Sequence, residues 1–371
     1  MELISERHPL LVVVGSGGVG KTTLAAALGV VSARRGHPSL VMTFDPSLRL
    51  KDALGVGEEA RERPVPVPLP GEDGAPRLAA SLLDARQTFD RLVERYAPDD
   101  AARRRILDNR FYHHLSGNLA GILEYMAVER LWEVAKEGTY EQVVLDTPPT
   151  RQALDFLEAP RRIVDFLESG VLRLALKPWF DAEGHLTGSS RLGFVGRRFE
   201  GFLDELVGLE LLRDMAEFFQ AFEPRFEGVR ERAAEVEGLM RSPRTRFVLV
   251  AGPGEERVAD TLYFARRLQE AGYHLAAVVV NRVHPPVSAA AAGSGTEVAD
   301  PTGDPCRPDG RRLLAWLGER DARGLAELTS LLADRHPLVA LPLLSTEPTD
   351  LAALEAIGDD LLARLAERTA T

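Results

Sequence analysis

The residue types with the clearest chemistry lie in one short segment near the start of the chain. Residues 15–23 read Gly-Ser-Gly-Gly-Val-Gly-Lys-Thr-Thr. Glycines at this spacing let the backbone curl until successive N–H groups point inward, which creates a cradle for phosphate oxygens. In such a cradle Lys21 would reach the outer phosphates of a nucleotide, and the hydroxyl of Thr22 would bind Mg²⁺. The residues expected to contact the nucleotide here are Gly15, Ser16, Gly17, Gly18, Val19, Gly20, Lys21, Thr22 and Thr23, and Lys21 is also assigned a catalytic role.

The elements on either side of this segment are those that a phosphate-binding loop (P-loop) requires. Residues 10–14 are an uninterrupted apolar run, which predicts a buried parallel strand ending at Gly15. Residues 22–35 predict a helix, whose N-terminus adds a partial positive charge beside the loop. A second apolar strand is predicted over 39–44. Strand, glycine-rich loop, helix and strand form a βαβ unit, so we favour a nucleotide site over a glycine turn without a ligand.

Polar residues follow three other predicted strands, and each of them suits a nucleotide site. Asp45, Asp146 and Asn281 stand where apolar runs end, and open α/β sheets bind ligands at the carboxyl ends of their strands. We assign Asp146 to Mg²⁺ together with Thr22, and Asp45 to orienting or deprotonating the attacking water. Asn281 carries a donor and an acceptor, which suits the edge of an adenine. Each of the three could instead cap a strand or begin a turn.

Apolar runs and helical stretches alternate over much of the chain. This alternation predicts an α/β fold, a P-loop NTPase with a mostly parallel, doubly wound sheet. Two long helical blocks interrupt it and are expected to form one helical subdomain inserted in the core. The predicted segments are a nucleotide-binding core over 1–84, a helical segment over 85–140, a core strand and the segment after it over 141–160, the helical subdomain over 161–242, and the rest of the core over 243–371 with a flexible loop at 285–310.

The composition restricts the expected partners and compartment. The formal net charge is −11, which disfavours nucleic acid as a partner because an acidic surface repels the phosphate backbone. Cys306 is the only cysteine, so neither an internal disulfide nor a multi-cysteine metal site is expected. We find no pattern of a signal peptide and no apolar run long enough to cross a membrane. We therefore expect a cytoplasmic protein, with peripheral contact to the inner face of the membrane left open.

Several motifs together resemble one family of P-loop proteins. Residues 45–54 resemble its switch I, and residues 146–150, which read Asp-Thr-Pro-Pro-Thr, resemble its switch II. Residues 280–282 and 341–343 are similar to its adenine-contacting strand end and its C-terminal nucleotide loop. This is the family of the arsenite-pump ATPase (ArsA) and the tail-anchored-protein targeting ATPases. Within it, the chain most resembles paired bacterial ArsA-like ATPases.

The resemblance implies a dimeric ATPase that closes over ATP and opens after hydrolysis. ATP and Mg²⁺ are the implied cofactors, and Asn281, Arg282 and Pro342 are implied nucleotide contacts. The helical subdomain is implied to move with the nucleotide state and, in the targeting branch, to hold an apolar helix or a membrane-protein client. Apolar stripes at helical spacing do occur within 161–242, but the ordinary packing of a helical subdomain explains them as well.

Departures from the family pattern bear on activity and on the partner. The family loop usually has a lysine where this chain has Ser16, and that lysine reaches the phosphates of the partner subunit. Its replacement leaves open a homodimer or a heterodimer with a related ArsA-like chain. In the alternative function, the chain is a nucleotide-sensing regulatory subunit of a heterodimer with little activity alone. Cys306 by itself cannot chelate arsenite, the CxxC of a zinc clasp is missing, and Arg49 replaces the usual asparagine of switch I.

Overall fold

The computed structural model describes residues 3–4, 9–44, 49–84, 88, 90, 93–94, 99–107, 122–168, 226–285 and 310–370. Asp45, Cys306 and nearly all of the predicted loop over 285–310 therefore lie outside the described residues. The chain divides into two compact units. The core unit comprises Met1–Leu82, Thr139–Ala153 and Met240–Thr371, and the helical unit comprises Leu83–Gly138 and Leu154–Leu239.

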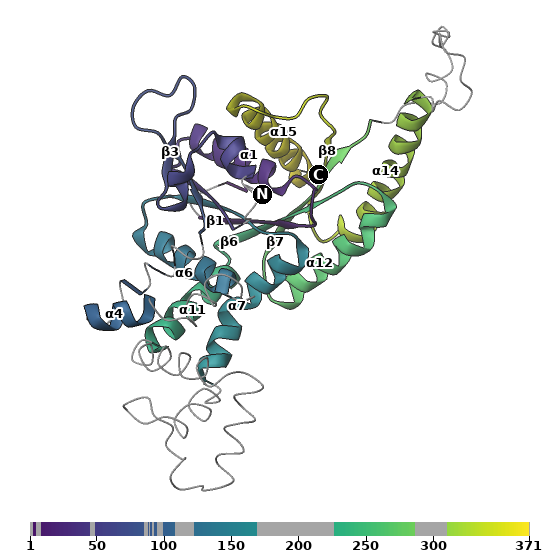
Figure 1. Cartoon of the computed structure of the whole chain (residues 1–371). Coiled ribbons are helices and arrows are strands. Elements are labelled where there is room, and N and C mark those ends of the chain that lie inside the picture. Colours follow the sequence, from purple (N-terminus) through teal and green to yellow (C-terminus); the bar gives the residue numbers. More distant parts are fainter. Residues whose placement is uncertain are drawn as a thin grey trace, which may run out of the picture. The chain divides into compact units, whose positions relative to one another are not determined.

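The core unit is built on a mostly parallel sheet, as the alternation of the sequence predicts (Figure 1). The described residues form an eight-stranded sheet in the order β3-β4-β2-β5-β1-β6-β7-β8. The strand that precedes the P-loop, β1, lies in the interior between β5 and β6. The strands are β1 (Leu10–Gly15), β2 (Ser39–Thr43), β3 (Val65–Val67), β4 (Leu78–Leu82), β5 (Gln142–Asp146), β6 (Thr245–Ala251), β7 (Leu275–Val283) and β8 (Leu338–Pro342).

One short strand is missing from the sequence-based prediction. β3 lies at one edge of the sheet and pairs antiparallel with β4, whereas β4 pairs parallel with β2 on its other side. Pro66 stands in its centre, and a proline inside an apolar run argues against a strand because it has no N–H to donate. An edge strand tolerates proline, since one side of the strand needs no sheet hydrogen bonds.

Helices cover both faces of the sheet in the core unit (Figure 1). On one face, α1 (Lys21–Arg34) packs against α15 (Leu351–Ala370) and against the short α2 (Arg49–Leu54). On the other face, α12 (Val258–Glu270) and α14 (Gly310–Leu332) pack against β6, β7 and β8. Two 3₁₀ turns, η1 (Glu58–Arg61) and η3 (Glu255–Arg257), complete the described elements of this unit.

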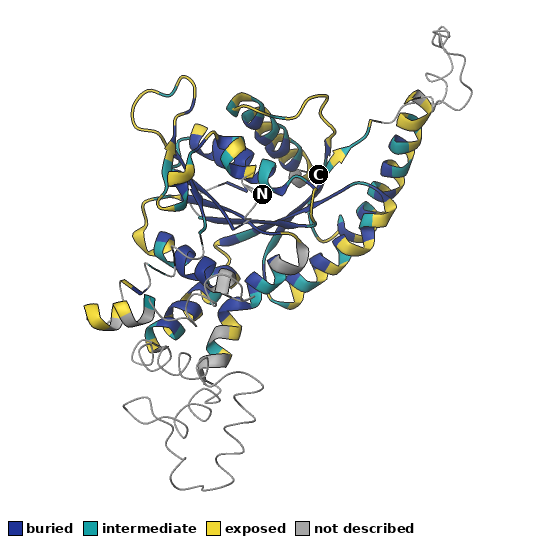
Figure 2. Ribbon diagram, in the orientation of Figure 1, coloured by how far each residue is buried: buried dark blue, intermediate teal, exposed yellow. Residues whose placement is uncertain are grey.

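The central strands are buried from both sides (Figure 2). Leu11, Val12, Val13 and Val14 of β1 have no exposed surface, which is why β1 reads as a continuous apolar run rather than an alternating one. The helices that cover them are also closely packed, because α1 and α15 approach each other at Gly358. A Cβ atom at Gly358 would lie 2.4 Å from Val31 Cγ2 and 2.8 Å from the carbonyl oxygen of Ala27.

The helical unit contains α4 (Asp100–Leu107), α6 (Ile122–Glu137), most of α7 (Thr150–Glu168) and most of α11 (Phe226–Arg241). A buried ion pair joins α6 to α11, since both oxygens of Glu129 accept from Arg232 Nε, at 3.0 and 2.7 Å. The Arg232 guanidinium also lies 5.6 Å from the centre of the Trp132 ring. Much of the predicted apolar stripe within 161–242 lies outside the described residues. None of the described helices is both long and apolar enough to cross a membrane.

Candidate nucleotide site

The P-loop connects β1 to α1, and its glycines are required by the conformation of the backbone. Gly15 has φ 148°, and a Cβ atom there would lie 2.0 Å from the carbonyl oxygen of Val250. Gly18 and Gly20 have φ 77° and 91°, in the left-handed region that favours glycine. A Cβ atom at Gly20 would lie 2.4 Å from the Asn281 amide nitrogen. Glycine at these positions therefore lets the loop pack against β6 and β7 and adopt the curled backbone of a phosphate cradle.

Lys21, the first residue of α1, is positioned at this loop. It is 6% exposed, and its Nζ donates to the carbonyl oxygen of Ser16 at 2.9 Å. The ammonium therefore reaches back over the loop from the N-terminus of the helix, where the helix dipole already favours an anion. The ammonium and the start of the helix therefore lie together at the loop, an arrangement that suits a bound phosphate group.

Asp146 meets two hydroxyl groups at the carboxyl end of the sheet. Thr22 Oγ1 and Thr43 Oγ1 donate to the same carboxylate oxygen, Oδ2, at 2.8 and 3.0 Å. The sheet register explains the meeting, because Asp146 at the end of β5 lies opposite Thr43 of β2 and Val13 of β1. Asp146 itself is fully buried. The structure thus brings together the two residues that the sequence assigns to Mg²⁺.

Thr43 is a residue of this site that the sequence-based interpretation missed. It is the last residue of β2, it is 3% exposed, and its hydroxyl orients the carboxylate of Asp146. A signal was present, since a hydroxyl follows the three apolar residues of the strand, Leu40, Val41 and Met42. Its meaning depends on the register between β2 and β5, which the sequence does not reveal.

These residues fit a magnesium ion that is shared with a nucleotide. Among the described residues, no three His, Cys, Asp or Glu side chains are grouped as a metal site, but Mg²⁺ commonly uses one or two carboxylates together with phosphate oxygens and waters. The Thr22 hydroxyl gives its hydrogen to Asp146, so its oxygen lone pairs are available for a cation. A carboxylate, a hydroxyl and an adjacent phosphate cradle form a suitable donor set.

Two side chains at the end of β7 hydrogen-bond to the backbone of the P-loop. Asn281 Nδ2 donates to the carbonyl oxygen of Val19 at 2.8 Å, and Arg282 Nη1 donates to that of Gly18 at 3.2 Å. Arg282 has φ 64°, which makes it the one non-glycine residue with positive φ among those described. Such a conformation costs about 1–2 kcal/mol outside glycine. The two side chains predicted to contact the base are therefore also the donors that hold the loop.

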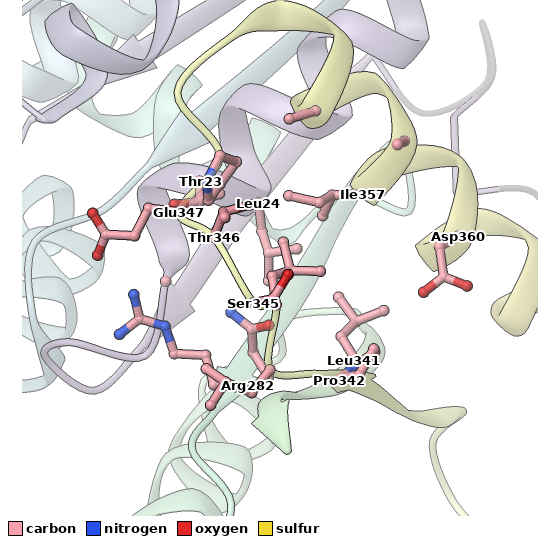
Figure 3. Close-up of a pocket in the computed structure, with 17 residues that line it drawn as sticks. Thr23, Leu24, Arg282, Leu341, Pro342, Ser345, Thr346, Glu347, Ile357 and Asp360 are labelled. Atoms are coloured by element: carbon pink, nitrogen blue, oxygen red, sulfur yellow. The ribbon is translucent and has the colours of Figure 1, made fainter. Parts of the chain in front are cut away.

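A cavity of about 570 Å³ opens beside the P-loop (Figure 3). It brings Gly20 and Thr23 together with Asn281, Arg282 and Pro342, which the sequence separates widely. Its size lies within the range of small-molecule sites. Apolar and polar residues line the rest of it: Leu24, Leu341, Leu343, Leu344, Ser345, Thr346, Glu347, Pro348, Ala353, Ala356, Ile357 and Asp360.

Asp45, the predicted catalytic carboxylate, is the site residue whose position is not described. Its neighbour Phe44 is buried, and the Phe44 N–H donates to the carbonyl oxygen of Asp146 at 3.2 Å. The chain therefore leaves β2 beside the Mg²⁺ ligands that we assign. The catalytic role of Asp45 stays a prediction.

Comparisons with known proteins point to one family. Residues 8–189 match the family model of the anion-transporting ATPases, and this span includes the P-loop, Thr43 and Asp146. ATPase GET3 of Podospora anserina is 25% identical over 272 residues, which cover 72% of this chain and 71% of that protein. ATPase get3 of Aspergillus terreus is 26% identical over 273 residues, with the same coverage. ATPase GET3B of Arabidopsis thaliana is 29% identical over 294 residues, 74% of this chain and 64% of that protein.

Proposed function

Because the chain belongs to the family of ArsA-like, anion-transporting ATPases, we propose that it is a switch ATPase whose nucleotide state controls its helical unit. It binds ATP with Mg²⁺ and hydrolyses ATP to ADP and phosphate. The observation that carries the proposal is the meeting of Thr22 and Asp146 at the start of α1, beside a glycine loop and a cavity. Phosphoryl transfer needs chiefly positioning and charge stabilisation, and this arrangement supplies both.

The phosphates are held by the loop and by Lys21. Backbone N–H groups of the loop and the N-terminus of α1 face the phosphate oxygens, while the Lys21 ammonium offsets the charge that develops on the transferred group. Thr22 and Asp146 would hold Mg²⁺, which would neutralise part of the phosphate charge. Asp45 orients a water molecule for attack on the terminal phosphorus and accepts its proton.

The base of the nucleotide occupies the cavity next to the loop. Leu343, Leu344 and Ile357 offer apolar surface for a planar ring, and Asn281 offers an amide at the boundary between ring and loop. Arg282 and Pro342 border the same space. No guanine-recognition sequence of the Asn-Lys-x-Asp type occurs in the chain, so adenine is the favoured base.

The dimer and the client belong to this proposal as well. Two nucleotide sites close on each other in the ATP state, with a second copy or a related ArsA-like chain as the partner. Ser16, in place of the usual loop lysine, favours a partner that supplies this lysine. The helical unit is a compact unit of its own, which suits a part that handles apolar helices or membrane proteins.

Steady-state hydrolysis of Mg-ATP over a range of protein concentrations tests the function, with Asp45→Asn and Lys21→Ala beside the natural chain. If a second copy of the chain is the partner, turnover per chain should rise with concentration. We expect it to fall by about 100-fold or more in Asp45→Asn, because a positioned general base contributes ~10²–10⁴ in rate. Binding of Mg-ADP, measured by calorimetry, should survive in Asp45→Asn and weaken in Lys21→Ala.

Other outcomes overturn parts of the proposal. Nucleotide binding without turnover at any concentration would exclude a self-sufficient ATPase and favour the regulatory subunit of a heterodimer. Unchanged turnover in Asp45→Asn would remove Asp45 from the mechanism. Absence of nucleotide binding by the natural chain would refute the nucleotide site itself.

A further inference from the structure

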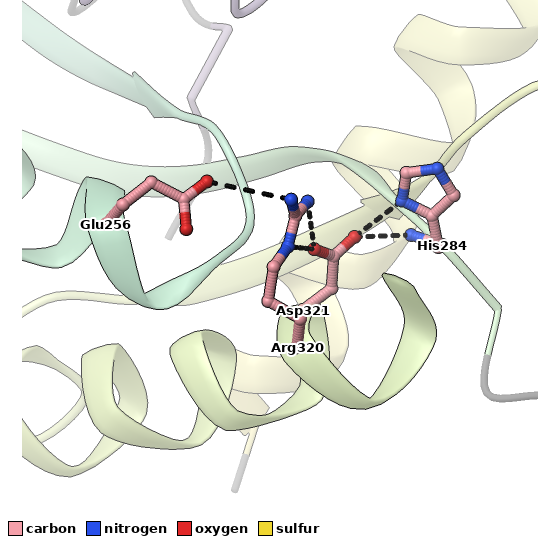
Figure 4. A network of polar contacts seen from close by, with 4 residues as sticks. All are labelled: Glu256, His284, Arg320 and Asp321. Carbon is pink, nitrogen blue, oxygen red and sulfur yellow. Dashed lines mark hydrogen bonds and ion pairs between the residues drawn. The ribbon is translucent and has the colours of Figure 1, made fainter. Parts of the chain in front are cut away.

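A buried carboxylate on α14 is bonded to the chain where β7 ends (Figure 4). Asp321 has no exposed surface. Its Oδ2 accepts from the backbone N–H of His284 at 3.0 Å and lies 2.7 Å from Nδ1 of the same histidine. Its Oδ1 accepts from Nε and Nη2 of Arg320, at 3.1 and 2.8 Å. Both oxygens are therefore used, one of them entirely on the residue that follows β7.

The charges around Asp321 make this contact strong. Burial alone would raise the pKa of Asp321, but the hydrogen bonds from the backbone and ring of His284 and from Arg320 outweigh it and hold the pKa below its usual value. Arg320 in turn forms an ion pair with Glu256 of η3, with Nη1 and Oε1 3.8 Å apart. The carboxylate is thus ionised in a dry environment, where charge-assisted hydrogen bonds are strongest.

The same stretch of chain carries the donors that brace the P-loop. Asn281 and Arg282 stand in the last part of β7, and they bond to the carbonyl oxygens of Val19 and Gly18. Arg282 adopts its strained positive φ between these bonds and the His284 contact. Strained backbone persists only where the surrounding structure enforces it. Asp321 contributes to this by hydrogen bonding to His284, directly after β7.

Packing of α14 alone does not require a carboxylate at this position. Leu328 and Leu332 of the same helix are buried, and an apolar side chain in place of Asp321 would hold a helix at least as well. A carboxylate that accepts both the N–H and the ring of one residue fixes the direction in which the chain leaves the sheet. The arrangement therefore suits a residue that orients the chain after β7 better than one that only packs α14 against the sheet.

We propose that Asp321 is a positioning residue of the nucleotide site, which fixes the end of β7 and thereby the Asn281 and Arg282 side chains at the P-loop and the base cavity. The proposal rests on the proposed function, because it assigns Asp321 to the same nucleotide site. Asp321 acts through His284 and touches neither phosphate nor base. Its removal is therefore expected to weaken nucleotide binding more than the chemical step, whose groups lie on α1, at the end of β5 and after β2.

Calorimetric titration with Mg-ADP and steady-state hydrolysis of Mg-ATP test this role in three variants of the full chain. Asp321→Asn keeps the shape but removes the charge. His284→Ala removes the ring contact and keeps the backbone contact. Arg323→Gln is the matched control on the same helix, because it breaks the exposed ion pair with Glu255, a kind of contact that contributes little.

We expect Asp321→Asn to raise the Kd for Mg-ADP and the KM for Mg-ATP by about tenfold, the usual effect of losing one charge-assisted hydrogen bond. The value of kcat should stay within about threefold of the natural chain if Lys21, Thr22 and Asp146 keep their places. His284→Ala should follow in the same direction, and Arg323→Gln should bind like the natural chain.

A lower melting temperature in Asp321→Asn with unchanged Kd and KM would overturn the proposal, because Asp321 would then stabilise the fold alone. If Asp321→Asn does not fold, the test rests on His284→Ala. An unchanged Kd for Mg-ADP in that variant likewise overturns the proposal. Failure of the natural chain to bind Mg-ADP is a separate result, which refutes the proposed function rather than the role of Asp321.

Discussion

Asp146 receives hydroxyl hydrogens from α1 and from β2, so its carboxylate is oriented by Thr43 as well as by Thr22. We predict that Thr43→Val raises the Mg²⁺ concentration for half-maximal hydrolysis by about tenfold or more, since partners that orient metal ligands typically contribute 10–100-fold. The free energy of unfolding should fall by only ~1 kcal/mol, the usual value of one buried hydrogen bond. Magnesium titrations of ATP hydrolysis and urea unfolding measure the two effects.

Thr147→Val is the matched control for that experiment. Thr147 is also buried, but its hydroxyl donates to the backbone oxygen of Val13 at 2.8 Å and not to Asp146. Its loss should lower stability by a similar amount and leave the Mg²⁺ dependence unchanged. Equal Mg²⁺ dependence in the two variants would show that Thr43 has no special effect on the carboxylate.

The lowered pKa of Asp321 predicts a dependence of stability on acid. A carboxyl group whose pKa is lower in the folded state stabilises the fold when ionised, fully above its ordinary pKa of 3.8, and this contribution is lost as the pH falls through the lowered value. The difference in urea midpoint between the natural chain and Asp321→Asn should therefore be constant above about pH 5 and shrink below about pH 4. A constant difference down to about pH 2.5 would mean that the pKa of Asp321 is the same in both states.

At single positions, the sequence alone could predict only those features that depend on the spacing of residues along the chain. A glycine pattern and a strand end are local signals, so the sequence could predict that Thr22 and Asp146 lie together beside the P-loop, while their roles in binding nucleotide and Mg²⁺ stay predictions. Thr43 and Asp321 could not be assigned, because their importance comes from contacts with Asp146 and His284, which lie far away in the sequence. The parts of Asn281, Arg282 and Pro342 in nucleotide binding stay predictions, although the structure places them around one cavity.

Among the elements, the contact between α1 and α15 leaves no room for an added side chain at Gly358. Alanine at Gly358 gains ~1 kcal/mol in helix propensity, but its Cβ would meet the backbone oxygen of Ala27 at 2.8 Å and Val31 at 2.4 Å. Overpacking of this kind typically costs ~1–3 kcal/mol. Since backbone cannot give way as a flexible side chain can, we predict that Gly358→Ala lowers the free energy of unfolding by about 1 kcal/mol or more.

Gly238→Ala on α11 should have the opposite effect and raise the free energy of unfolding. A Cβ atom there meets no atom of the described residues within 4 Å, so the propensity gain of ~0.5–1 kcal/mol should appear as added stability. Urea unfolding of both variants checks the pair. A higher free energy of unfolding in Gly358→Ala would mean that α15 can move away from α1 without a loss of stability.

The elements that sequence predicted well are those with long apolar runs or strong helical patterns. The run over 10–14 became β1, and the helix predicted over 22–35 became α1. β3 was missed because Pro66 interrupts a very short run. The contact of α14 with the end of β7 could not be predicted either, since Asp321 stands beside Glu319 and Arg320 in the sequence and nothing in this charged run indicates that Asp321 is fully buried.

At the scale of the molecule, the division into a core unit and a helical unit raises the question of coupling between them. The chain passes from one unit to the other within α7 and again within α11. A nucleotide can shift the helical unit only if its states differ in affinity for that nucleotide. The proposed switch therefore requires that ATP-like and ADP-bound forms differ in parts of the chain that touch no nucleotide.

Hydrogen exchange measures this requirement directly. We predict that Mg-ADP and Mg²⁺ with a non-hydrolysable ATP analogue both slow amide exchange in the P-loop and α1, because binding stabilises the elements that contact the ligand. If nucleotide state controls the helical unit, exchange in α6 must differ between the two ligands. Lys21→Ala, which should bind neither ligand well, must abolish both effects. Protection confined to the core unit with both ligands would leave an ATPase whose helical unit does not respond to nucleotide, and the switch proposal would fail while the nucleotide site stood.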